Sequence, residues 1–193
     1  MDDIAENNLY LRHLGKSFSD SRIIDAASFV LRTAAFEWEF SRLFSEDEWK
    51  SEQRKKLEEE ASKELDCLIE TSTGKLKKIY KDLKKSVVSY LSLSQKISQI
   101  FEEYGANMLD DFGRYMYKLN NISYDHSEIG ERIGKQRNNF AHGNLDKEFI
   151  NESLLDVVFL EEIVLAMQLQ YFGIDEIEIK QIINEVFRHN LIA

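Results

Sequence analysis

The sequence predicts an all-α protein, because it lacks helix breakers and repeats its apolar residues at helical spacing. The 193 residues include no proline and only eight glycines, so long helices can run without their commonest interruptions. Hydrophobic residues make up 43% of the chain and aromatic residues 11%, enough to form a packed core rather than a disordered chain. We therefore expect a single helical domain over residues 1–193, built as an up-and-down bundle.

The first clear helix is the aromatic segment "SDSRIIDAASFVLRTAAFEWEFSRLF", residues 19–44. Ser19 or Asp20 can cap its start. Apolar residues recur at steps of three and four from Ile23 to Trp38, a pattern typical of a core helix. The preceding segment, residues 3–18, predicts one further helix that ends near Gly15.

Residues 45–104 predict an antiparallel helical hairpin that projects from the body. Its first helix opens with a capping box, Ser45 and Glu48, and is rich in glutamate, whereas its second helix, residues 73–104, contains six lysines within residues 75–85. Opposite charges favour pairing of the two helices. The lysines have a second interpretation, contact with phosphates, but a solvated face or pairing with the acidic helix is favoured.

Four further helices complete the predicted bundle: residues 107–119, 125–143, 151–173 and 175–191. Capping boxes at Asp125 with Glu128 and at Asp175 with Glu178 predict two of the starts. The helix over 151–173 is apolar over most of its circumference, so it should lie at the centre, and its two glutamates argue against a membrane span. We interpret His13, His126 and His189 as surface or capping histidines.

Composition and charge argue against a disulfide-bonded, a zinc-binding, a secreted or a broadly nucleic-acid-binding protein. The single cysteine, Cys67, allows no intrachain disulfide and no zinc-binding cysteine pattern. The acidic start "MDDIAENN" differs from a secretory signal, so we expect a soluble cytoplasmic protein. A net charge of −10 argues against broad binding of nucleic acid, so any such site must be a local basic patch.

The segment "QRNNFAHG", residues 136–143, carries the strongest chemical signal. Arg137 lies five residues before His142, Asn138 follows the arginine, and Gly143 follows the histidine. One interpretation is ordinary helix chemistry, since cations and glycine commonly end a helix. The other is a permanent cation and a titratable imidazole that act together on a phosphate.

The segment "RNNFAHG" resembles the R-x-x-x-x-H signature of the HEPN superfamily, in the variant with a polar residue after the arginine. The aromatic helix "RTAAFEWEFSRLF", the signature helix "ERIGKQRNNFAHG" and the hydrophobic helix that follows resemble the Apea-like branch. The similarity extends from about residue 20 onward as architecture, and only the signature is specific. It implies a HEPN-like bundle that acts as a metal-independent endoribonuclease without a cofactor.

The resemblance further implies a homodimer that cleaves RNA as a toxin or phage-defence effector. It is also compatible with a chain that forms the C-terminal part of a longer protein, with a sensor domain or a neutralising partner. Arg137, His142 and Asn138 would be catalytic. Arg132, Lys135 and Arg137 give the signature helix a basic side. We therefore expect Arg132 and Lys135, together with His126 just before the helix, to contact the substrate.

Helix geometry favours a composite site. On an ideal helix, Arg137 and His142 point about 140° apart and lie about 7.5 Å apart along the axis. One helix therefore presents them poorly to one phosphate, whereas two helices related by a two-fold axis bring two of each around one cleft. Glu37 or Glu39 of the aromatic helix could orient either side chain.

Two alternatives use the same residues without catalysis. The chain could be a HEPN-like module for dimerisation or for binding RNA or a partner protein. It could also be a purely structural helical domain whose charged hairpin recruits a partner.

Overall fold

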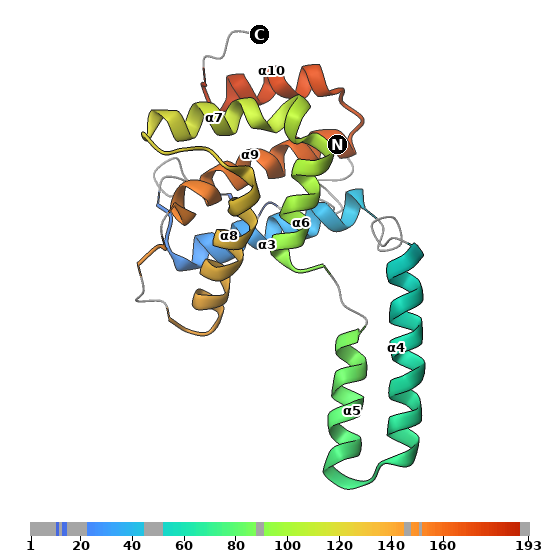
Figure 1. Cartoon of the computed structure of the whole chain (residues 1–193). Helices are drawn as coiled ribbons and strands as arrows, with labels where there is room; N and C mark the ends of the chain where they lie inside the picture. Colours follow the sequence, from blue (N-terminus) through green and yellow to red (C-terminus); the bar gives the residue numbers. More distant parts are fainter. Residues whose placement is uncertain are drawn as a thin grey trace. The chain divides into compact units, whose positions relative to one another are not determined.

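The computed structural model describes residues 11, 13–14, 23–44, 52–87, 91–144, 148–150 and 152–189. All regular structure within these ranges is helical, which confirms the predicted all-α class (Figure 1). The chain divides into two compact units, which we call the body (Met1–Leu43 with Ser92–Ala193) and the hairpin unit (Phe44–Leu91). Most of the predicted helix over 3–18, and the predicted capping box at Ser45 and Glu48, lie outside the described residues.

The body is organised around one central apolar helix, α9 (Ser153–Tyr171). Residues on most sides of α9 are buried, as its sequence predicted, and four other helices make its most extensive contacts. Those four helices are α3 (Ala26–Leu43), α7 (Asp110–Leu119), α8 (His126–Ala141) and α10 (Glu176–Val186). Within the described residues, no helix combines the length and the apolar composition that a membrane span requires.

Helix α3 begins later than predicted. Residues 23–25 are not helical, so a start at Ser19 or Asp20 is wrong. Asp25 and Ser28 exchange hydrogen bonds instead: the Ser28 amide donates to Asp25 Oδ1 at 2.7 Å, and the Asp25 amide donates to Ser28 Oγ at 2.9 Å. This reciprocal arrangement satisfies amides that a helix start leaves without intrahelical partners.

The predicted helix over 73–104 is wrong, because a new helix, α6 (Leu93–Ile100), begins in its second half. Ser92 and Gln95 form a complete capping box at this start. Helix α6 then passes without interruption through a π-helix, η1 (Phe101–Leu109), into α7. Figure 1 shows α6 and α7 running in clearly different directions.

Helix α8 has the predicted position, and its start and end have identifiable causes. The Asp125 side chain caps the start by accepting a hydrogen bond from the Ser127 amide. The backbone turns at Gly143, where φ is +82°, a conformation that favours glycine. Gly130 brings α8 close to α6, since a Cβ at this position would lie 2.7 Å from the Ser94 carbonyl oxygen.

Within its described residues, the hairpin unit consists of two helices, α4 (Glu52–Thr71) and α5 (Gly74–Val87), that pack against each other. Gly74 forms the turn with a φ of +62°. Lys84 of α5 forms an ion pair with Asp66 of α4, as the opposite charges of the two helices predicted. The predicted hairpin over 45–104 is longer than this unit, because residues from Ser92 onward belong to the body.

Candidate active site

Arg137 lies at the surface of the body, beside a carboxylate of α3 and a lysine of α6. Its side chain is 39% exposed, and its Nη2 lies 3.5 Å from Glu37 Oε2. The other oxygen of Glu37 lies 3.6 Å from Lys96 Nζ. Glu37 thus bridges two cations from different helices. Of the two glutamates that could orient the signature residues, Glu37 contacts Arg137, whereas Glu39 is buried against Arg42 and Gln168.

This cluster of Glu37, Lys96 and Arg137 has the properties of an anion site. Its two cations outnumber its one carboxylate, and the ion pair to Arg137 is long and partly solvated. Such exposed pairs contribute little free energy, typically about 0–1 kcal/mol. A phosphate, which accepts hydrogen bonds from a guanidinium in a two-pronged geometry, can therefore compete with Glu37 for Arg137.

His142 forms the end of α8, and its side chain is exposed. Its backbone amide donates to the carbonyl oxygen of Asn138 at 3.1 Å, which is an ordinary helix ending. Asn138 is also exposed. Within the described residues, no hydrogen bond or ion pair joins Arg137 to Asn138 or His142, so the three predicted catalytic side chains do not assemble into one cluster in a single chain.

Arg132, which we predicted to contact substrate, is instead part of a buried ionic network. Its Nε and Nη2 atoms each lie 2.8 Å from an oxygen of Asp156, which is fully buried on α9. Tyr117 donates a short hydrogen bond to the same carboxylate. Arg132 also binds Glu128 at 2.7 Å, so the Glu128 side chain forms an ion pair within α8 instead of the predicted capping box. The guanidinium is occupied by the protein itself, and we assign it a structural role.

Lys135 is exposed, and it forms an ion pair with Glu131 at 2.6 Å. It lies two residues before Arg137, or about 200° around an ideal helix, so the two cations face different sides of α8. Asn138, three residues after Lys135, lies on nearly the same side as Lys135. The described surface of α8 therefore presents Lys135 and Asn138 on one side and Arg137 on another.

His126 lies at the opposite end of α8 from His142. The 16-residue separation corresponds to about 24 Å along an ideal helix. Its Nδ1 lies 3.1 Å from Asp110 Oδ1, and its ring stacks on Phe101. Tyr124 donates to the same Asp110 oxygen at 2.8 Å, and burial raises the pKa of this phenol. His126 is therefore remote from Arg137 and His142 of its own chain, and its predicted contact with the same substrate phosphate finds no support in this placement.

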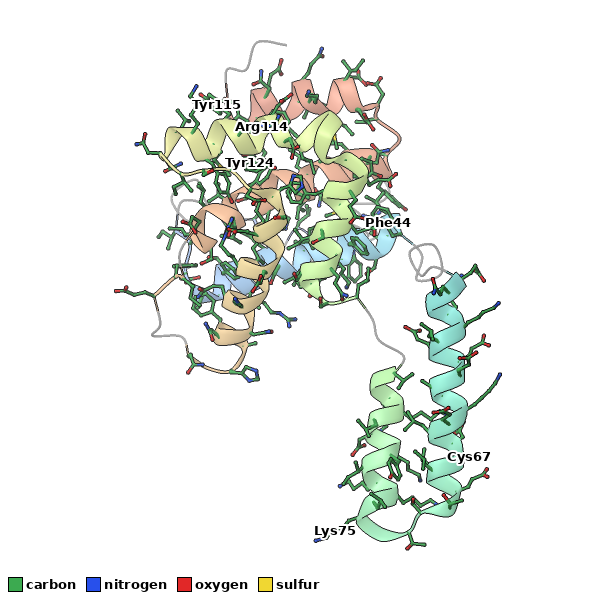
Figure 2. The ribbon with its side chains drawn as sticks, viewed as in Figure 1. Phe44, Cys67, Lys75, Arg114, Tyr115 and Tyr124 are labelled. Atoms are coloured by element: carbon green, nitrogen blue, oxygen red, sulfur yellow. The ribbon has the colours of Figure 1, made fainter. Side chains whose placement is uncertain are left out.

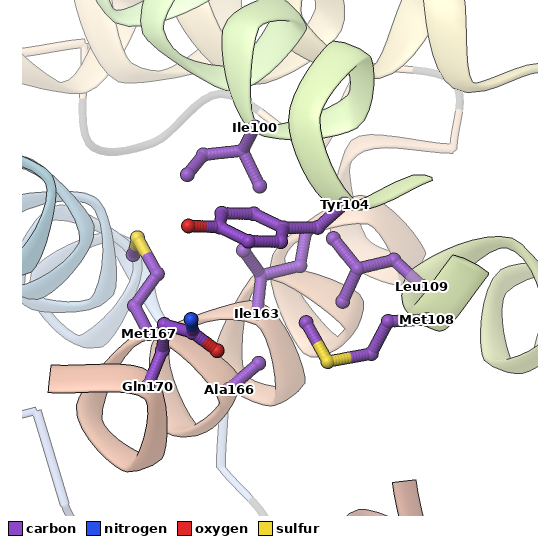
Figure 3. A pocket seen from close by; sticks show the side chains of 8 residues that line it. All are labelled: Ile100, Tyr104, Met108, Leu109, Ile163, Ala166, Met167 and Gln170. Carbon is purple, nitrogen blue, oxygen red and sulfur yellow. The ribbon is translucent and has the colours of Figure 1, made fainter. Parts of the chain in front are cut away.

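The body also contains a small apolar pocket between η1 and α9 (Figure 3). Its lining includes no charged side chain, so it offers no cation to a phosphate and no acid or base that titrates near neutral pH. The lining residues are Ile100, Tyr104, Met108, Leu109, Ile163, Ala166, Met167 and Gln170.

One member of the candidate site was missed by sequence reasoning. Lys96 lies 41 residues before Arg137, and no motif connects the two positions.

Among the described residues, no group of three or more His, Cys, Asp or Glu side chains is placed to hold a metal ion. Comparisons of the chain with protein-family models, with curated proteins and with solved structures find no match.

Proposed function

We propose that the protein is a metal-independent endoribonuclease of HEPN type, active as a homodimer. The observation that carries the proposal is the exposure of Arg137 and His142 at one end of α8, with Arg137 in a loose, exchangeable ion pair. The resemblance of "RNNFAHG" to the HEPN signature supports the same function. A role as a toxin or phage-defence effector belongs to this proposal, because the resemblance implies it.

RNA carries the nucleophile for this reaction. The 2′-oxygen attacks the adjacent phosphorus and forms a new O–P bond, while the bond from phosphorus to the 5′-oxygen of the next nucleotide breaks. One imidazole accepts the proton of the 2′-hydroxyl, and a protonated imidazole donates a proton to the departing 5′-oxygen. The products are a 2′,3′-cyclic phosphate and a 5′-hydroxyl. DNA lacks the 2′-hydroxyl and should remain intact.

A dimer can gather the imidazole and guanidinium groups that a single chain keeps apart. Two copies of α8 related by a two-fold axis can place two imidazoles, one as base and one as acid, and two guanidinium groups around one phosphodiester. Arg137 then stabilises the charge that develops on the phosphate oxygens. Asn138 hydrogen-bonds the substrate or an imidazole.

Glu37 and Lys96 have supporting roles in this scheme. Glu37 orients Arg137 before substrate binds, and Lys96 adds a second positive charge beside it. Because the whole chain has a net charge of −10, these local cations must attract the RNA against the field of the body.

The test is cleavage of RNA by the purified protein in excess EDTA, with analysis of the product ends. Wild type should produce 2′,3′-cyclic phosphate ends, and Arg137→Ala and His142→Ala should each lose cleavage. Arg114→Ala, which removes an exposed arginine of α7, is the matched control and should cleave like wild type. Equal cleavage by all four proteins would show a contaminating nuclease and contradict the proposal.

A non-catalytic module for dimerisation or for binding RNA or a partner is the second candidate. The separation of Arg137 from His142 within one chain favours it, because binding needs no such cluster. A folded dimer that binds RNA through Arg137 but cuts no RNA, including total cellular RNA, would support the module over the enzyme.

A further inference from the structure

The hairpin unit leaves its apolar side chains only partly covered. No described residue of α4 or α5 is buried. On α5, Leu76, Ile79 and Leu83 are 49%, 53% and 48% exposed. Their spacing of three and four residues places them on one face of the helix. On α4, Leu57 and Leu68 are also exposed, and their separation of 11 residues, about three turns, puts them on one face as well.

The charges of the hairpin unit are separated by helix rather than mixed. Helix α4 contains seven acidic and four basic residues, a net charge of −3. Helix α5 contains six lysines and one aspartate, a net charge of +5. The whole unit, residues 44–91, has 11 acidic and 11 basic residues and is neutral. Ion pairs that join described residues of the unit include Lys84 with Asp66, between the two helices, and Lys85 with Asp82, within α5.

We propose that the hairpin unit is a self-association module, in which the hairpins of two copies of this chain pack into an antiparallel four-helix bundle. A two-fold axis can place the acidic α4 of one copy against the lysine-rich α5 of the other, so that opposite charges meet at both new contacts. The same packing covers the half-exposed leucines and isoleucine, as the core of a four-helix bundle requires.

The observations favour a second hairpin over RNA as the occupant. An RNA-binding surface is favoured where cations predominate, whereas in this unit the acidic helix lies beside the basic one and balances its charge. An RNA backbone would also leave the apolar face formed by Leu76, Ile79 and Leu83 uncovered. A second copy of the hairpin matches both the charges and the apolar residues. This inference does not depend on the proposed nuclease activity.

The chain provides its own probe for the test. Cys67 is the single cysteine; it is exposed and lies on α4 toward the tip of the hairpin (Figure 2). A nitroxide on Cys67 of the full-length protein reports the distance between two hairpins by pulsed dipolar spectroscopy. Sedimentation equilibrium on the same samples gives the dissociation constant of the dimer.

The first variant makes the apolar face of α5 polar without changing its charge: it combines Leu76→Gln, Ile79→Gln and Leu83→Gln. We expect a defined distance between labels in wild type, its loss in the variant, and an association weaker by about tenfold or more. Leu119→Gln, a change of an exposed leucine on α7, is the matched control and should behave like wild type. The same distance and dissociation constant in wild type and the triple variant would overturn the proposal.

A charge-swap pair makes the test independent of misfolding. One variant carries Lys75→Glu, Lys78→Glu and Lys81→Glu, which makes both helices acidic; the other carries Glu59→Lys, Glu60→Lys and Glu64→Lys, which makes both basic. Neither should pair with itself, and an equimolar mixture should restore the distance between labels. Absence of pairing in the mixture, with both variants helical by circular dichroism, would contradict the model. If wild-type hairpins do not pair and the acidic variant loses affinity for RNA, the hairpin is an RNA-binding arm instead.

Discussion

The role of Arg132 can be tested against that of Arg137, five residues away on the same helix. Replacement of Arg132 by alanine leaves the carboxylate of Asp156, which is 0% exposed, without the guanidinium that contacts both of its oxygens. Breaking a buried ion pair in this way costs about 3–5 kcal/mol. Arg137→Ala removes one long pair to a carboxylate that is 30% exposed, which should cost about 0–1 kcal/mol.

These energies translate into melting temperatures that are easy to distinguish. In a protein of this size, 1 kcal/mol shifts the Tm by about 2–4 °C. We therefore expect Arg132→Ala to lower the Tm by about 6–20 °C and Arg137→Ala by less than about 4 °C. The assay is thermal unfolding followed by circular dichroism at 222 nm, with urea unfolding at 25 °C to obtain the free energy directly.

A double variant sharpens the interpretation. Arg132→Met combined with Asp156→Leu removes both charges from the buried site, so it should recover most of the stability that the single variant loses. If Arg132→Ala and Arg137→Ala have the same Tm, the structural role of Arg132 is refuted. Asp156 would then have to carry a buried charge without its guanidinium partner and without loss of stability.

Three further predictions concern packing, pH and helix capping. Gly130→Ala should destabilise the protein by about 1–3 kcal/mol, because its Cβ would lie 2.7 Å from the Ser94 carbonyl oxygen. Gly134→Ala, whose nearest contact would be at 3.8 Å, should instead stabilise α8 by up to about 1 kcal/mol. Urea unfolding of both variants checks this pair, and equal effects would contradict the close approach of α8 to α6. Burial raises the pKa of Glu162 above its ordinary value of 4.5. Protonation of Glu162 therefore stabilises the folded state below pH 4.5, and this contribution is lost as the pH rises through the folded-state pKa. The unfolding free energy of wild type relative to Glu162→Gln should accordingly fall as the pH rises above 4.5, and a difference that stays constant with pH would disprove the shift. Asp175→Ala removes the side chain that accepts hydrogen bonds from two amides at the start of α10 and should cost about 0.5–2 kcal/mol in the same assay; an unchanged midpoint would show that the cap contributes nothing.

Sequence patterns predicted the helices that local rules determine. The apolar circumference of α9 indicated its central position, and Asp125 and Asp175 indicated two helix starts, because capping depends on residues within one turn. The patterns predicted the extent of α8 for the same reason. They missed the start of α3 at Ala26, because Ser19 and Asp20 match the same rule as Asp25.

Other features depend on tertiary partners that lie far away in the sequence. The interpretation of His13 and His189 as surface or capping residues is wrong: both are buried, and His189 Nε2 lies 2.9 Å from Glu162 Oε1. Arg132 pairs with Asp156 of α9, 24 residues away in the sequence, so its structural role depends on the packing of α8 against α9. The same limit applies to Lys96, since only packing of α6 beside α8 and α3 brings its ammonium group to Glu37.

The π-helix η1 fixes the rotational phase between α6 and α7. Ile97 and Ile100 before it, and Phe112 and Met116 after it, all face the core, although a wider turn separates the two pairs. Removing one residue from η1 would turn every later side chain of α7 by about 100°, which would swing Phe112 toward water. Substitutions within η1 should therefore be tolerated much better than insertions or deletions, which change its length.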